Sequence, residues 1–124
     1  MSTETLTDLQ LSVMKALWHV GEGTVSDILT VLVADGKELA PTTVATMLQR
    51  LSKQGWVKHR KSGRQFLYRA KVNREDAAKG VLDRVLSSFF GGKVSALTAQ
   101  LLESEQLSAD ELKEMRRLIK GKVG

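Results

Sequence analysis

The chain has 124 residues, of which 42% are hydrophobic, and its 19 Lys and Arg against 14 Asp and Glu give a net charge of +5. This length suits one domain, or a small domain with an appendage. The sequence contains no cysteine, which excludes disulfides, thiolate metal sites and a cysteine nucleophile. No apolar run approaches the roughly 18 residues of a membrane span, and the polar, partly acidic start MSTETLTDLQ does not resemble a signal peptide. We therefore expect a cytoplasmic protein with no membrane insertion.

Two short helices are predicted near the N-terminus. Thr7 and Gln10 have the spacing of a capping box, and the helix that they begin extends to about His19. A second helix begins within residues 24–27 and ends near Asp35. Apolar residues recur at helical spacing in both segments, so one face of each helix is expected to be buried: Leu11, Met14, Leu17, Trp18, Val25, Ile28, Leu29 and Leu32.

A third helix is predicted to begin at Pro41. Proline suits the first turn of a helix, and Thr42 or Thr43 is suited to cap it. Gly55 is the residue type that typically ends a helix. One face of this helix is apolar: Val44, Met47, Leu48 and Leu51. The opposite face is short, polar or basic: Thr42, Thr43, Ala45, Thr46, Gln49, Arg50 and Lys53.

A basic hairpin is predicted directly after this helix. Residues 56–60 and 65–69 read as two strands joined at residues 61–64. Between Arg50 and Arg74 the sequence contains nine Lys or Arg and no Asp or Glu. Such a single-sign run indicates a polyanion as partner, whereas a basic face without a ligand is the alternative.

Three short helices followed by a basic hairpin predict a winged helix-turn-helix domain over residues 1–72. The fold class is therefore mostly α with a small β-hairpin, with the helix after Pro41 as the recognition helix. Its outward side chains are the candidates for reading bases: Thr42, Thr43, Ala45, Thr46 and Gln49. Basic residues of the helix and hairpin are the candidates for phosphate contacts: Arg50, Lys53, Lys61 and Arg64. Met47, Trp56 and Tyr68 are expected to pack inside the domain.

These assignments predict the partner as well as the contacts. Threonine and alanine methyl groups contact the thymine methyl group, and glutamine pairs with adenine edges. The predicted target is therefore double-stranded DNA with A/T-containing half-sites. For Thr42 and Thr43, capping of the helix is the competing role.

Residues 73–124 are predicted to form three more helices. Asn73 and Ser108 are caps, and Gly91-Gly92 ends the first of these helices. Helices of this size bury their apolar faces poorly as a lone appendage, so we expect them to form a dimerisation region. The alternative is that they fold back onto the winged helix as ordinary core. The residues expected at the dimer interface are apolar: Val85, Leu86, Phe89, Leu101, Leu102, Leu112, Met115 and Ile119.

The sequence resembles the penicillinase-repressor family, which includes the methicillin-resistance and the copper-responsive repressors of Gram-positive bacteria. The resemblance rests on residues with intact spacing in the N-terminal two thirds: Leu6-Thr7, Val13-Met14, Leu17-Trp18, Thr43-Val44, Thr46, Leu48, Arg50-Leu51, Lys53, Gly55, Gly63-Arg64 and Tyr68. It implies a homodimeric repressor that binds an inverted-repeat operator, with the C-terminal helices forming the dimer.

The resemblance also bears on the inducing signal. Copper-responsive members carry cysteine motifs, which this chain lacks. Members that control β-lactam resistance are inactivated by cleavage between an Asn and a Phe, and the equivalent bond here is Gln100–Leu101. The sequence departs from the family pattern at this bond, so cleavage by a membrane sensor metalloprotease is carried by analogy alone.

The sequence gives little support to an enzymatic function or a metal site. The chain has two histidines, His19 and His59, and neither lies near carboxylates in the sequence. It also lacks a phosphate-binding glycine loop or a nucleophile motif, so we expect no enzymatic activity, cofactor or metal. Two alternatives stay open: a ligand-sensing winged-helix regulator with a pocket at its dimer interface, and a winged-helix protein-interaction module without specific DNA binding.

Overall fold

The computed structural model describes residues 6–124 and divides the chain into two units, one ending at Val81 and one from Leu82 to Gly124. Residues 1–5, which belong to the predicted N-terminal domain and to the polar start of the chain, lie outside the described residues. The predicted boundary after residue 72 stays a prediction. Among residues 6–124, no helix combines the length and the apolar character that crossing a membrane requires.

The first two helices begin with capping boxes. Helix α1 spans Asp8–Val20, and Thr7 and Gln10 form the predicted reciprocal pair of side chain-to-backbone hydrogen bonds. Helix α2 spans Val25–Ala34 and begins with the same arrangement. The backbone N–H of Asp27 donates to Thr24 Oγ1 at 3.2 Å, and that of Thr24 donates to Asp27 Oδ2 at 2.9 Å. These bonds satisfy backbone groups that a helix start otherwise leaves unpaired.

Replacing Thr24 with Ala should therefore lower the free energy of unfolding by about 1 kcal/mol, the usual cost of losing a cap. Urea denaturation followed by circular dichroism measures this. Thr30→Ala, in the middle of the same helix, is the matched control and should change the free energy by less than about 0.5 kcal/mol. Equal effects of the two substitutions would contradict the cap.

Helix α3 spans Pro41–Lys53, and its cap differs from the prediction. Ala40 occupies the cap position without a side-chain hydrogen bond, so the prediction that Thr42 or Thr43 caps this helix was wrong. Pro41, which has no N–H, takes the first helical position, where an N–H would find no partner within the helix. Both threonines therefore lie inside the first turn. Thr46 Oγ1 instead donates to the backbone oxygen of Thr42 at 2.9 Å.

The end of α3 matches the prediction for Gly55. This glycine has a φ of +88°, a region that other residues rarely adopt. The conformation lets the N–H of Trp56 donate to the carbonyl of Leu51 at 2.9 Å, as in a Schellman motif. The chain therefore passes from α3 into the hairpin through the three residues 54–56.

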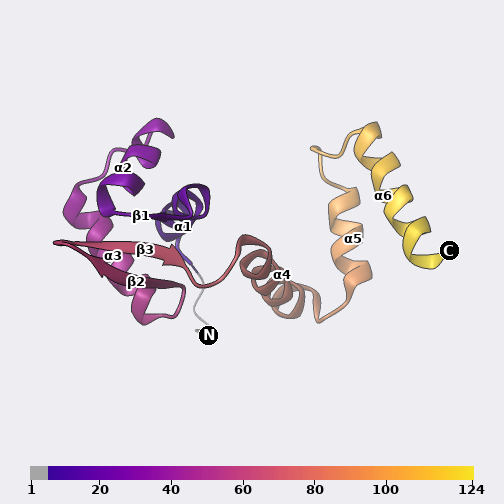
Figure 1. Cartoon of the computed structure of the whole chain (residues 1–124). Coiled ribbons are helices and arrows are strands. Elements are labelled where there is room, and N and C mark those ends of the chain that lie inside the picture. The colour runs from indigo at the N-terminus through magenta and orange to yellow at the C-terminus, as the bar shows by residue number, and fades with distance from the viewer. Residues whose placement is uncertain (1–5) are drawn as a thin grey trace. The chain divides into compact units, whose positions relative to one another are not determined.

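The wing is a three-stranded antiparallel sheet with the strand order β1-β3-β2. Strands β2 (Val57–Ser62) and β3 (Gln65–Ala70) form the predicted hairpin, which extends past β1 (Figure 1). Strand β1 (Glu22–Gly23), between α1 and α2, was not predicted; it pairs with β3, with Gly23 opposite Tyr68. The hairpin is thus hydrogen-bonded to the segment that connects α1 and α2.

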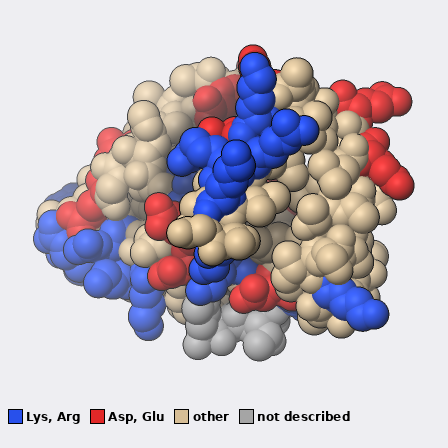
Figure 2. All heavy atoms as spheres, turned by 90° about the vertical axis from the view of Figure 1, so that its right-hand side faces the viewer, with Lys and Arg blue, Asp and Glu red and all other residues tan. Residues whose placement is uncertain are grey.

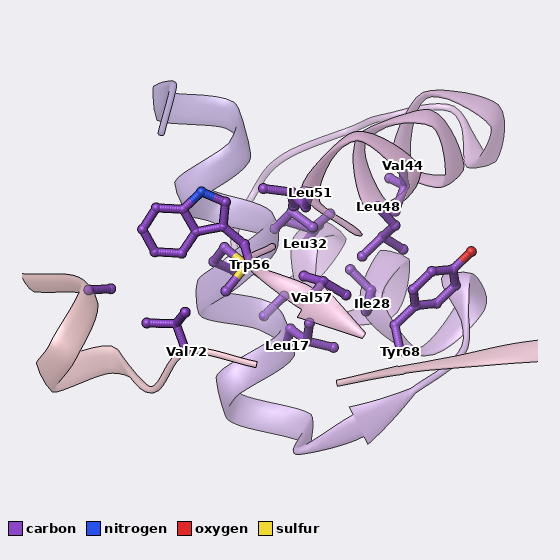
Figure 3. Close-up of a cluster of buried hydrophobic side chains, with 14 residues drawn as sticks. Leu17, Ile28, Leu32, Val44, Leu48, Leu51, Trp56, Val57, Tyr68 and Val72 are labelled. Carbon is purple, nitrogen blue, oxygen red and sulfur yellow. The ribbon is translucent and has the colours of Figure 1, made fainter. Parts of the chain in front are cut away.

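The core of the first unit joins its helices to the base of the wing (Figure 3). Trp56 is 6% exposed and Tyr68 is 5% exposed, and Met47 packs against the cluster, so their predicted packing roles are confirmed. The indole N–H of Trp18 donates to the carbonyl of Val72 at 2.9 Å. Fully buried side chains make up the centre: Val13, Met14, Leu17, Ile28, Leu32, Val44, Leu48 and Leu51.

Helix α4 spans Arg74–Phe90 and crosses from the first unit into the second. Ala77, in its second turn, belongs to the core of the first unit. Asn73 Oδ1 accepts from the backbone N–H of Asp76 at 2.8 Å, as expected of a cap. Helices α5 (Val94–Leu102) and α6 (Ala109–Val123) complete the second unit, and Ser108 caps α6 by accepting from Glu111 N–H.

Apolar side chains are exposed along the second unit. Neither α5 nor α6 contains a buried residue, and Phe89 at the end of α4 is 79% exposed. Among the residues predicted for dimerisation, three are partly buried: Val85, Leu86 and Met115. The others are exposed: Phe89, Leu101, Leu102, Leu112 and Ile119. The predicted amphipathic helices are present, and their role in dimerisation stays a prediction.

Candidate nucleic-acid interface

The outer face of α3 carries the residues predicted to read bases. Thr42, Thr43, Thr46 and Gln49 are exposed, and Ala45 is partly exposed. The opposite face of the helix is anchored in the core by side chains with no exposed surface: Val44, Leu48 and Leu51. Because the buried residues fix the rotation of the helix, the five candidates are presented together on one surface.

The four residues predicted to contact phosphates are all exposed. Arg50 and Lys53 lie in the last turn of α3, where positive charge is also favourable toward the negative end of the helix dipole. Lys61 lies near the end of β2, and Arg64 lies in the turn between β2 and β3. Gly63, at the tip of this turn, has a φ of +62°. The structure thus places two candidate cations on the helix and two at the tip of the wing.

A shallow groove connects the outer face of α3 with the wing. It is lined by Ala45 and Gln49 of α3 and by Phe66 and Tyr68 of β3. Ser26, in the first turn of α2, lines it too. Phe66 is 47% exposed, and neither it nor Ser26 was a sequence-based candidate. Their place in this groove depends on how α2 and β3 pack beside α3, which local sequence patterns do not encode.

An aromatic cluster fixes the wing against the end of α3. The ring of His59 packs edge-on against Phe66, with 5.2 Å between centroids, and lies 5.7 Å from the ring of Tyr68. His59 Nδ1 and Ser52 Oγ form a hydrogen bond of 3.1 Å, which links α3 to β2. Burial raises the pKa of the Tyr68 phenol. His59 therefore connects the helix to the wing.

One ion pair joins strand β2 to strand β1 across the sheet. Arg60 Nη2 donates to Glu22 Oε1 at 2.8 Å, and Arg60 Nε donates to Glu22 Oε2 at 3.2 Å. The hydrogen bond from Arg60 lowers the pKa of the Glu22 carboxyl group, and the positive charge of Arg69 adds to this effect. Figure 2 shows a face of the molecule on which Lys and Arg lie among Asp and Glu. Within residues 50–74, by contrast, every Lys, Arg, Asp or Glu present is a Lys or an Arg.

Within the described part of the chain, no three His, Asp or Glu side chains gather closely enough to hold a metal ion. The arrangement offers hydrogen-bond donors, methyl groups and cations on one exposed surface. Phosphate and base edges are the chemistry that such groups recognise.

Comparison with known proteins agrees with this geometry. The family model described as penicillinase repressor matches residues 6–121. The chain belongs to the penicillinase repressor family.

Individual members of the penicillinase repressor family match over most of their length. The penicillinase repressor of Bacillus licheniformis is 29% identical over 92% of this chain and 88% of its own. The methicillin resistance regulatory protein MecI of Staphylococcus aureus (strain N315) is 24% identical over 97% of each chain. The solution structure of the B. licheniformis BlaI monomeric form in complex with the blaP half-operator is 31% identical, with a TM-score of 0.50, and covers 60% of this chain and 90% of that one.

Membership of the penicillinase repressor family confirms three predictions. The fold is a winged-helix DNA-binding domain followed by C-terminal helices, as predicted. The protein is a DNA-binding transcriptional repressor, and it is not an enzyme. The individual contact residues, the dimer interface and the cleavage site stay predictions.

Proposed function

We propose that this penicillinase repressor homologue is a homodimer that binds an inverted-repeat operator, with one α3 helix in the major groove of each half-site. The observation that carries the proposal is the exposed polar face of α3 beside the cations of the wing. The related BlaI has been solved in complex with a half-operator, which supports the same docking here. Since the target is genomic DNA, we propose that the protein acts in the cytoplasm.

Base reading is assigned to the outer face of α3. The Gln49 side chain offers both a donor and an acceptor, as the edge of adenine requires. The methyl groups of Thr42, Thr43, Ala45 and Thr46 suit the methyl group of thymine. Because Thr46 Oγ1 donates to the backbone of Thr42, its hydroxyl is held toward the helix. These residue types favour A/T-containing half-sites.

Phosphate contacts are assigned to Arg50, Lys53, Lys61 and Arg64. These side chains are long, positively charged and exposed, so they can reach toward the phosphates of a bound duplex. Their contribution is independent of sequence and fixes the register of α3 in the groove.

A second copy of the chain is the proposed partner of the exposed apolar residues in α4–α6. Single exposed apolar residues are common on proteins, but here they recur on three consecutive helices. A two-fold dimer would match the two-fold symmetry of an inverted repeat.

The first test is binding to the promoter upstream of the chain's own gene, measured by fluorescence anisotropy against a scrambled duplex of equal composition. Tight binding to the promoter duplex alone, with a stoichiometry of two protomers, is the expected result. Equal, weak binding to both duplexes would overturn the proposal and would favour a protein-interaction module.

Gln49→Ala tests the base-reading assignment. This variant should lose about 1–3 kcal/mol of discrimination between the operator and an operator with substituted A·T pairs. Lys53→Gln is the control for phosphate contact and should weaken binding to both duplexes equally. If Gln49→Ala also weakened both equally, Gln49 would not read bases.

Relief of repression is proposed to involve cleavage at Gln100–Leu101 by a membrane sensor metalloprotease. Both residues lie at the end of α5 and are exposed in the single chain, and because Leu101 is also a proposed dimer contact, the dimer would have to open there before cleavage. A protease binds its substrate in an extended form, so the last turn of α5 would have to unwind first. Mass spectrometry of the repressor after induction would identify the bond that is cut, and an intact chain would contradict this route.

A further inference from the structure

The three-stranded sheet has an outer face that carries three cations and one carboxylate. Directly paired residues of an antiparallel sheet lie on the same face. Glu22 pairs with Arg69, and Arg69 pairs with Lys58, so these three side chains share a face. Arg60 follows Lys58 by two residues in β2 and therefore lies on the same face. The buried Tyr68 belongs to the opposite face, which packs on the core.

The carboxylate comes from outside the basic segment. Residues 50–74 contain no Asp or Glu, and Glu22 reaches the wing because β1 pairs with β3. Strands β1 and β2 lie on either side of β3, so the pair between Glu22 and Arg60 spans the middle strand. The side chains remain open to solvent, at 62% exposure for Arg60 and 32% for Glu22.

Glu22 occupies one edge of the Arg60 guanidinium group and offsets its charge. A guanidinium group presents the same planar fork to a carboxylate and to a phosphate. In this structure two donors of the fork, Nε and Nη2, already bind the two oxygens of Glu22. A DNA phosphate therefore has to displace Glu22 to bind this edge of Arg60, and at the other edge it meets the negative charge of Glu22 close by. Lys58 and Arg69 are exposed beside the pair.

We propose that the outer face of the wing sheet is a sequence-independent phosphate-binding surface, and that Glu22 moderates its affinity for DNA by occupying Arg60. This inference rests on the proposed binding of DNA. Non-specific binding depends almost entirely on phosphate neutralisation, so Glu22 lowers the affinity for non-operator DNA.

Glu22→Gln tests the proposal, because it removes the charge of the carboxylate and keeps the size of the side chain. Binding of the full-length protein to a scrambled duplex is measured by fluorescence anisotropy between 50 and 200 mM salt. Each cation released per bound protomer should steepen the slope of log affinity against log salt by about 0.9. The affinity lost over this range should then grow by about threefold to fourfold for each protomer bound.

Glu114→Gln is the matched control. It breaks a comparable Glu–Arg pair on α6, with Arg117, and changes the net charge by the same amount. The double variant Glu22→Gln/Arg60→Gln removes the released cation as well. We expect a wild-type slope for Glu114→Gln and for the double variant, with thermal unfolding used to verify that each variant is folded.

Three results would overturn the proposal: a slope of Glu22→Gln equal to that of Glu114→Gln, weaker binding by Glu22→Gln, or a steep slope retained by the double variant. In each of these cases the wild-type protein still binds DNA. Failure of the wild-type protein to bind either the operator or the scrambled duplex would instead contradict the proposed function itself.

Discussion

Raising the salt concentration from 50 to 200 mM should weaken operator binding by about 10³- to 10⁵-fold. This range applies to a protein that makes roughly 6–10 phosphate contacts. Four candidate cations per protomer, Arg50, Lys53, Lys61 and Arg64, are exposed on α3 and the wing, so a dimer would reach this number. Fluorescence anisotropy with a labelled promoter duplex at a series of salt concentrations provides the slope.

A variant that lacks one of these cations tests whether they cause the slope of log affinity against log salt concentration. Arg64→Gln should reduce the slope by about 0.9 for each protomer bound, because one phosphate contact is lost. Lys113→Gln, which removes one exposed cation from α6, should leave the slope unchanged. A flat salt dependence of the wild-type protein would mean that phosphate neutralisation does not drive binding.

Leu48→Ala should lower the free energy of unfolding by about 2–5 kcal/mol, because the side chain has no exposed surface and its removal leaves a cavity. Leu48 lies at the centre of the contact between α3 and the rest of the core (Figure 3), so the loss should also disturb the presentation of the outer face. Urea denaturation measures the change, with the wild type and the variant at the same protein concentration so that the contribution of dimerisation is the same in both.

The neighbouring residue provides the control for this substitution. Gln49→Ala truncates an exposed side chain of the same helix and should change the free energy of unfolding by less than about 0.5 kcal/mol. The two variants therefore separate stability from base reading at adjacent positions. A small effect of Leu48→Ala would show that the first unit relaxes around the cavity.

Helix boundaries were predictable because their signals are local. Thr7 with Gln10, and Thr24 with Asp27, are each three residues apart, and both pairs form the capping boxes that this spacing indicates. The apolar positions predicted in the first three helices are buried or partly buried for the same reason, since a helical period is visible within one segment. The glycine stop at Gly55 is a single-residue signal and was also found.

Features that depend on distant segments were missed. Strand β1 has two residues, too few for an alternating pattern, and it exists because β3 offers a pairing edge far along the chain. The pair between Glu22 and Arg60 joins residues 38 positions apart and depends on that strand. The prediction of a threonine cap for α3 was wrong for a different reason. Pro41 and Thr42 both suit a helix start, and the proline occupies the first helical position.

The candidate DNA contacts show the same contrast between local signals, which the sequence reveals, and features that depend on distant segments. The amphipathic pattern of α3 assigned its outer face correctly as exposed, and the single-sign run of residues 50–74 identified the wing as basic. The sequence did not indicate which face of the wing each cation occupies, because this depends on the register of β2 with β3. Lys61 and Arg60 are neighbours in sequence and lie on opposite faces.

The short connection between α3 and the hairpin determines which groups lose conformational entropy during folding and which lose it when DNA binds. Three residues, 54–56, separate the two elements, and the carbonyl of Trp56 accepts from the N–H of Lys71 at 2.8 Å, which closes the base of the hairpin. The hydrogen bond between Ser52 and His59 adds a second link. The backbone is thus ordered when the protein folds, and DNA would meet a preformed surface. The conformational cost of binding would then fall on the long side chains proposed to contact phosphates, such as those of Arg50 and Arg64.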